Sequence, residues 1–345
     1  MPDANLSEKP SFGDWIRKWA EEHLPFQLPT LPLPQTAKNL DKAAAKIVLA
    51  VGDNVSARLK ASTKGVNSRA SEAATLSKIA QVGLLREPTL FEARAVDYVL
   101  EKALEGQANR ESILKLAFED VSDQPPTADA DAEIDSDWLD RFAKFASEKS
   151  NEDVQKIWAK ILAGEIRQPG SSSLRTLEFL STVTSAEAER IVRIFKYAIN
   201  PGWIPRYVSS FEKGMMPYED LHFCDEIGLI TGGISIIGNS NITLNSVKND
   251  SFDTGLSYGK KASIIVGNNS KAQINIQVFP FSRIAKEIFG ISDNIEYDYS
   301  FFEEFFLSLS SEAAVDKIFI GDALRTPSNK ENYSVSNLKE IFTRS

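Results

Sequence analysis

Three consecutive amphipathic helices with their start and stop signals constrain the fold of this chain most strongly, and they occupy residues 134–197. The first clear helical pattern follows Ser150, and the acidic Asp153 three residues on can reach back to it, which predicts an N-cap at Ser150. The pattern ends at Gly164 and the Pro169-Gly170 pair. Apolar residues at helical spacing predict its buried face: Val154, Ile157, Trp158, Ile161 and Leu162.

The next two helices have equally clear beginnings. Ser172 or Ser173 can cap a second helix, in which leucines recur at helical spacing. Thr184 and Glu187 have the spacing of a capping box, which predicts the start of a third helix. The stretch therefore predicts a bundle of amphipathic helices with short connections.

At these residues the chain resembles an uncharacterised bacterial family called domain of unknown function 2806. The resemblance is specific over residues 105–200, and the helix-loop-helix around Trp158 is more weakly similar to the abortive-infection protein Abi-alpha. No activity comes with this family, so the resemblance implies only a bacterial, soluble, mostly helical protein, with a hint of phage defence. These motif and core residues carry it: Asp137, Trp138, Gln155, Trp158, Leu162, Gly164, Glu165, Pro169 and Gly170.

Composition places the chain among ordinary globular proteins of a reducing compartment. Its 345 residues leave room for two or three domains. A single cysteine, Cys224, excludes a disulfide framework. The N-terminus lacks the apolar core of a signal peptide, and no stretch has the roughly 18–20 apolar residues that span a bilayer. We therefore expect a cytoplasmic protein without a transmembrane segment.

The net charge of −9 is unevenly distributed. Residues 37–116 hold 13 Lys and Arg against 9 Asp and Glu, whereas residues 119–153 hold 3 against 12. The acidic stretch either lies on the basic helices of its own chain or addresses a separate partner. We expect the first, because an intramolecular contact carries a smaller association cost.

Changes in sequence character predict a mainly α protein, a helical bundle followed by a winged-helix-like α+β module. Residues 218–230 resemble the second half of a winged helix, and short β patterns follow at 242–244, 263–266 and 274–278. The expected organisation is an N-terminal amphipathic segment and Pro-rich linker at 1–36, a helical region at 37–120, a mobile acidic linker at 121–136, a helical core at 137–200, the winged-helix-like module at 201–290, and a C-terminal helix and extension at 291–345.

Candidate chemistry is sparse, and we expect no catalytic residue, cofactor or metal site. The alternating acids at 129–137 lack the glycine of a calcium-binding loop. His222 and Cys224 are too few for a zinc site. One candidate anion site remains at the start of the second helix, where exposed amides and a guanidinium could hold a phosphate. It comprises Ser171, Ser172, Ser173 and Arg175.

Three functions fit these features. The leading prediction is a non-enzymatic interaction or regulatory protein with an unidentified protein partner. The second is a DNA-binding winged-helix protein, although residues 201–290 hold 8 basic and 8 acidic residues and so lack the cationic excess that phosphate contacts need. The third is an unrecognised carboxylate-based enzyme or effector. The oligomeric state has no signature in the sequence.

Overall fold

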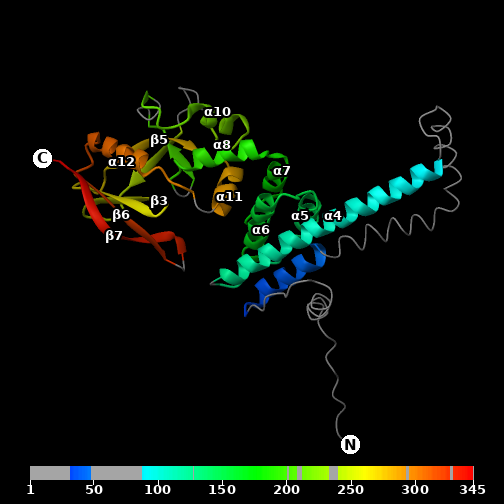
Figure 1. The fold of residues 1–345 in the computed structure, drawn as a ribbon. Coiled ribbons are helices and arrows are strands. Elements are labelled where there is room, and N and C mark those ends of the chain that lie inside the picture. Colours follow the sequence, from blue (N-terminus) through cyan, green and yellow to red (C-terminus); the bar gives the residue numbers. More distant parts are fainter. Residues whose placement is uncertain are drawn as a thin grey trace, which may run out of the picture. The chain divides into compact units, whose positions relative to one another are not determined.

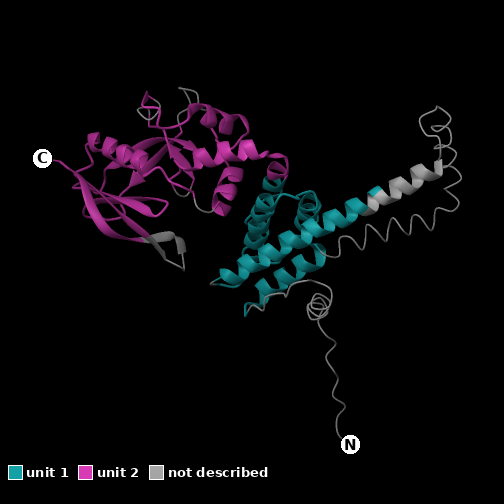
Figure 2. Ribbon diagram, in the orientation of Figure 1, with its two compact units in different colours: residues 1–177 teal, residues 178–345 magenta. Residues whose placement is uncertain are grey.

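The computed structural model of the protein describes residues 32–47, 88–126, 128–199, 202–207, 212–232, 240–292, 295–326 and 329–344. The chain divides into two compact units, residues 1–177 and residues 178–345 (Figure 2). The expected N-terminal amphipathic segment lies outside the described residues.

The first unit is helical (Figure 1). It contains a helix over residues 34–47, the long helix α4 (Pro88–Asp123), α5 (Ser136–Ala146), α6 (Glu152–Arg167) and the start of α7 (Leu174–Thr182). Helix α4 packs mainly against α6. The shared core consists of large apolar side chains, among them Ile113, Phe118, Phe142, Trp158 and Leu162.

The helix ends follow the sequence signals closely, with one displacement. The capping box of Thr184 and Glu187 is present at the start of α8 (Ser185–Phe195), as predicted. The N-cap of α6 is Asn151 and not Ser150, so that prediction was wrong by one residue. The Asn151 side chain accepts hydrogen bonds from the N–H groups of Asp153 and Val154, which are the second and third residues of the helix.

The acidic segment before α5 lies on the helix over residues 34–47, which confirms the expected intramolecular contact. The Asp129 carboxylate accepts hydrogen bonds from the N–H groups of Gln35 and Thr36 at 3.0 and 2.8 Å. Lys42 pairs with Glu133. Ala130 and Ile134 are buried. Residues 128–134 are therefore anchored to this helix.

The second unit combines helices with β-structure. Its helices are the end of α7, α8, α10 (Tyr218–Glu226), α11 (Arg283–Ile291), α12 (Tyr299–Ser308) and the 3₁₀ turn η2 (Leu309–Ser311). The strands are β1 (Trp203–Pro205), β2 (Asn241–Asn245), β3 (Phe252–Tyr258), β4 (Lys261–Gly267), β5 (Gln273–Pro280), β6 (Lys317–Thr326) and β7 (Asn329–Thr343).

The described strands form two antiparallel sheets. The smaller has the order β1-β5-β2, and the larger has the order β3-β4-β6-β7. Phenylalanines of α12 are buried in the core of this unit, where Phe302 stacks on Tyr258 of β3 with ring centroids 4.1 Å apart. The predicted strands near 242–244, 263–266 and 274–278 are confirmed as β2, β4 and β5.

The predicted fold class was wrong: the protein is an α+β protein, not a mainly α one. The winged-helix assignment is not supported either, because the strands after residue 240 divide between two sheets. Here β2 pairs with β5, while β3 and β4, which lie between them in sequence, pair with each other in the other sheet. Strand β4 then pairs with β6, so the larger sheet recruits residues far beyond the expected module.

Candidate functional site

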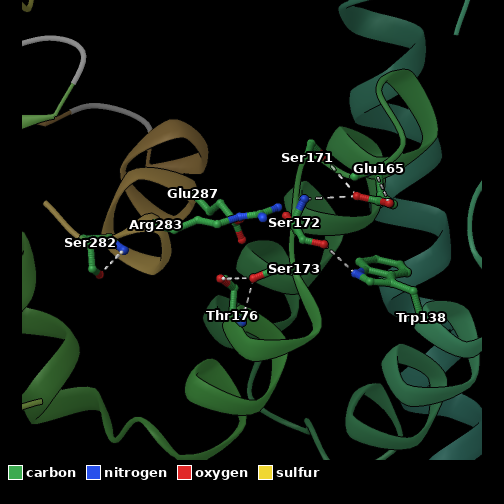
Figure 3. Close-up of polar contacts among 11 residues, drawn as sticks. Trp138, Glu165, Ser171, Ser172, Ser173, Thr176, Ser282, Arg283 and Glu287 are labelled. Atoms are coloured by element: carbon green, nitrogen blue, oxygen red, sulfur yellow. Dashed lines mark hydrogen bonds and ion pairs between the residues drawn. The ribbon is translucent and has the colours of Figure 1, made fainter. Parts of the chain in front are cut away.

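The loop predicted as an anion site surrounds a carboxylate that belongs to the protein (Figure 3). Glu165 on α6 is 2% exposed. Its carboxylate accepts hydrogen bonds from the N–H of Gly170 at 2.6 Å, the hydroxyl of Ser171 at 3.1 Å and the N–H of Ser172 at 3.1 Å. These donors are therefore occupied by Glu165, and an external anion would have to compete with it.

The end of the same loop caps helix α7. The Ser173 hydroxyl accepts a hydrogen bond from the N–H of Thr176 at 3.3 Å, which identifies Ser173 as the capping residue among the two predicted (Figure 3). Arg175 is exposed in the first turn. The loop thus caps α7 and binds Glu165. Binding of an external anion there stays a prediction.

The two tryptophans of the family motif hold the first unit together. The Trp138 indole N–H donates to the Ser172 carbonyl at 2.7 Å (Figure 3). Its ring stacks on Phe142 at 5.2 Å, and Phe142 in turn lies 5.4 Å from the Trp158 ring. The motif therefore joins α5, α6 and the loop into one core.

Gln155 completes a polar network on the buried face of α6. Its amide donates to the Lys149 carbonyl at 2.8 Å and to the Asn109 side chain at 3.3 Å, and it accepts from the Ser112 hydroxyl at 2.7 Å. Buried polar groups need such partners because an unpaired one costs about 1–3 kcal/mol. The family motif residues in the first unit are therefore explained by packing and hydrogen bonding.

The residues weighed for metal binding serve the structure as well. Asp220 binds Arg190 at 2.8 Å and Arg193 at 2.6 Å, which ties α10 to α8. Burial raises the pKa of Cys224 to about 12, so its thiol stays protonated and unreactive at neutral pH. Within the described part of the chain, no three His, Cys, Asp or Glu residues gather as metal ligands.

The second unit contains a cavity of about 280 Å³ that the sequence did not indicate. We call it the β6–β7 cavity. Its apolar walls are Tyr258 at the end of β3, Tyr299 at the start of α12, Ile320 on β6 and Ile341 on β7. The Tyr258 ring is fixed by its stacking on Phe302. Burial raises the pKa of Tyr258, so its phenol remains a neutral hydrogen-bonding group.

One end of the β6–β7 cavity is a fixed polar cluster. Asp322 on β6 pairs with Lys261 at 2.6 Å and accepts a hydrogen bond from the Asn337 amide at 2.7 Å. Both contacts hold the pKa of Asp322 below its usual value, Lys261 making the larger contribution. Asp322 is therefore a stable anion whose two partners are set in place.

Asn337 reaches Asp322 through a β-bulge. Ile320 pairs with Lys339 and Asp322 pairs with Ser336, so β7 has one extra residue between these pairs. Asn337 has φ 51° and is the one non-glycine residue with positive φ that the described ranges contain. A bulge redirects side chains, and uncommon backbone conformations concentrate at functional sites.

Two charged side chains at the β6–β7 cavity lack an ion-pair partner among the described residues. Lys339 on β7 and Glu303 on α12 both line it. Neither forms an ion pair or a hydrogen bond with another described residue. The cavity therefore offers an ammonium, a carboxylate, two tyrosines and an aliphatic wall to a ligand.

Sequence reasoning missed this site because its residues come from four separate segments. Lys261, Glu303, Asp322 and Lys339 are ordinary surface charges until strand pairing brings them together. The mostly polar composition of β7 is the local feature that could have indicated a role outside the core.

Comparison with known proteins gives a family and nothing beyond it. The family model described as "Protein of unknown function (DUF2806)" matches residues 93–301. No curated protein matches the chain, and no solved structure does. No helix among the described residues is long and apolar enough to cross a membrane.

Proposed function

The chain belongs to the DUF2806 family, and on that premise we propose that it is a non-enzymatic regulatory or interaction protein whose second unit binds a small molecule in the β6–β7 cavity. The observation that carries this proposal is the pair of charges Lys339 and Glu303, which have no ion-pair partner among the described residues and lie beside a β-bulge in a half-open cavity. Ligand sites typically combine apolar walls with a few convergent polar groups.

The division of the chain into two units supports a regulatory protein that senses a small molecule. The polar side chains of the family motif in the first unit are engaged in the helix network, as with Glu165 and Gln155. The first unit then supplies a rigid helical scaffold, and the second supplies the ligand site. A protein partner would bind the ligand-bound form of the protein in preference to the ligand-free form. A role in phage defence is an expectation of the same proposal, tested by plating efficiency of phage on cells with and without the gene.

A cavity-filling variant tests the proposal on the full chain. A panel of sugars, nucleotides, amino acids and organic acids is screened by the shift in melting temperature. A ligand at 100 times its Kd stabilises the native state by about 2.7 kcal/mol, which a melt detects readily. Ile341→Trp fills the cavity and should abolish the shift. Leu338→Trp is the matched control, because Leu338 lies on the same strand, is 50% exposed and does not line the cavity. A panel without any cavity-dependent ligand would contradict the proposal.

The carboxylate-based enzyme is a second candidate, favoured by the presence of Glu303 and Asp322 in one cavity. Asp322 is held as an anion by Lys261 and Asn337, so proton transfer would fall to Glu303. Recovery of the bound ligand by mass spectrometry separates the two functions. Unchanged ligand supports the regulatory protein, and a product that requires Glu303 supports the enzyme.

Duplex DNA is not among the expected partners. The neutral balance of residues 201–290 leaves little charge to attract phosphates. We expect no binding of labelled duplex DNA at physiological salt by fluorescence anisotropy.

A further inference from the structure

The charges of the β6–β7 cavity define the class of ligand it takes. We infer that the ligand is a small zwitterion, an amino acid with an apolar or aromatic body, whose carboxylate binds Lys339 and whose ammonium binds Glu303. This inference rests on the proposed function, since it specifies the ligand of that same cavity.

The first argument is electrostatic. The cavity has four charged side chains, and two of them, Lys261 and Asp322, neutralise each other at 2.6 Å. The remaining ammonium of Lys339 and carboxylate of Glu303 make no ion pair with each other or with any other described residue. A ligand with one charge would leave one of them without a partner. A zwitterion gives each an opposite charge, which is the complementary arrangement.

The second argument is size. A volume of about 280 Å³ corresponds to about nine water molecules at roughly 30 Å³ each. This is below the range of about 300–1,000 Å³ that drug-sized ligands occupy. A single amino acid suits a cavity of this volume.

The third argument concerns the uncharged walls. Tyr258 of β3 and Tyr299 of α12 have ring centroids 5.8 Å apart, and Ile320 and Ile341 come from β6 and β7, in the same sheet as β3. Aromatic and aliphatic surfaces favour an apolar or planar group between them. The neutral Tyr258 phenol adds no third charge. The uncharged side chains of the cavity thus favour an apolar group in the ligand, and the two charged side chains favour its carboxylate and its ammonium.

The bulge positions one of these charges. Lys339 lies two residues after Asn337, where the extra residue in β7 changes which side chains lie on each face of the sheet. The Asn337 amide anchors the bulge to Asp322 at 2.7 Å. The strained residue, the fixed ion pair and the unpaired Lys339 therefore belong to one local arrangement.

Calorimetric titration of the full chain tests the inference with three matched compounds. L-Phenylalanine carries both charges, 3-phenylpropanoate lacks the ammonium, and phenethylamine lacks the carboxylate. L-Leucine and 5-aminopentanoate extend the series to an aliphatic body and to charges set further apart. We expect a zwitterion to bind and the singly charged analogues to bind about 10–100-fold more weakly, because each loses one charged contact.

Two pairs of variants locate the contacts. Lys339→Gln and Glu303→Gln should each weaken zwitterion binding about 10–100-fold. Both residues are exposed, so these variants should fold normally. Lys317→Gln and Glu304→Gln are the controls. Lys317 is on the neighbouring strand, paired with Glu340, and Glu304 is adjacent on α12, paired with Lys213. The controls should bind as the natural chain does.

The outcomes separate the inference from the proposed function. If a sugar or a singly charged compound binds and Ile341→Trp abolishes it, the cavity is a ligand site, but the zwitterion inference fails. Zwitterion binding that survives both Lys339→Gln and Glu303→Gln would place the contact elsewhere and overturn the inference as well. If no compound binds, both are overturned.

Discussion

At the scale of single residues, Glu165 accepts the hydrogen-bond donors of the loop that the sequence predicts as an anion site. The Pro-Gly-Ser loop and the helix start do present hydrogen-bond donors to an anion, as the sequence indicated. The anion is the carboxylate of Glu165, which is two turns from Trp158 on the same helix. Its presence in the family motif is explained by this contact. Sequence patterns identified the residue and the loop separately, but only the fold joins them.

Trp158 and Ile157 give a matched pair at this scale. The sequence placed both on the buried face of α6, but Trp158 is 1% exposed and Ile157 is 42% exposed. Trp158→Ala should lower the free energy of unfolding by about 3–5 kcal/mol, because it empties a packed site between Phe142 and Phe145. Ile157→Ala should cost less than about 1 kcal/mol. Denaturant unfolding of both variants checks the difference, and equal losses would show that the helix faces are assigned incorrectly.

At the scale of elements, the acidic segment acts as a cap for a distant helix. Hydrogen bonds from the N–H groups of Gln35 and Thr36 lower the pKa of Asp129. Because the folded-state pKa is depressed, the stabilising contribution is present above the unfolded pKa of about 3.9 and is lost as the pH falls through the folded value. Asp129→Asn should therefore lower the melting temperature at neutral pH. The difference in melting temperature between this variant and the natural chain should become smaller at acidic pH.

The control for Asp129 is its neighbour Asp131. This residue is exposed and makes no hydrogen bond or ion pair with the rest of the described chain. Asp131→Asn should leave the melting temperature unchanged across the pH series. If the melting temperature of Asp129→Asn stays below that of the natural chain by a constant amount down to strongly acidic pH, the loss of stability comes from packing and not from the charged cap.

The bulge in β7 gives a second prediction about elements. A Cβ on Gly321 would collide with the Ser336 carbonyl oxygen and lie 2.7 Å from a methyl group of Val335. Since backbone cannot yield as a flexible side chain can, Gly321→Ala should destabilise the protein by about 1–3 kcal/mol. Gly290→Ala is the control, because nothing lies within 4 Å of its Cβ position and it is on a helix. Thermal melts should show a loss for the first and no loss for the second.

At the scale of the whole molecule, local signals were readable and long-range pairings were not. The capping box at Thr184, the strand at 273–280 and the phenylalanine-rich helix after Tyr299 follow from short stretches of sequence. Strand β3 alternates from Phe252 to Tyr258, but Asp253 and Gly255 within it have low strand propensity, and β7 is mostly polar, so neither stands out as a strand in the sequence. The lining of the β6–β7 cavity extends over 83 positions of the sequence, from Tyr258 to Ile341. Strand pairing brings these residues together, and no local pattern encodes it.

The division into two units leads to a prediction about fragments. The sequence placed the boundary of the C-terminal module at residue 201, but α8 contributes Ile191, Ile194 and Phe195 to the core of the second unit. The Phe195 ring lies 5.3 Å from both Phe281 and Phe289. Fully burying a large apolar side chain contributes about 1.5–3 kcal/mol, so losing three removes an amount comparable with the total of about 5–15 kcal/mol that stabilises a domain.

We therefore expect a fragment of residues 173–345 to unfold in one cooperative thermal transition, since it keeps α8 and the Ser173 cap. A fragment of residues 201–345 should lack that transition and bind hydrophobic dyes. Circular dichroism melts of the two fragments, made and purified in parallel, measure this directly. Cooperative melting of the shorter fragment would mean that α8 is dispensable to the core. Failure of the longer one would mean that the second unit needs the first in order to fold.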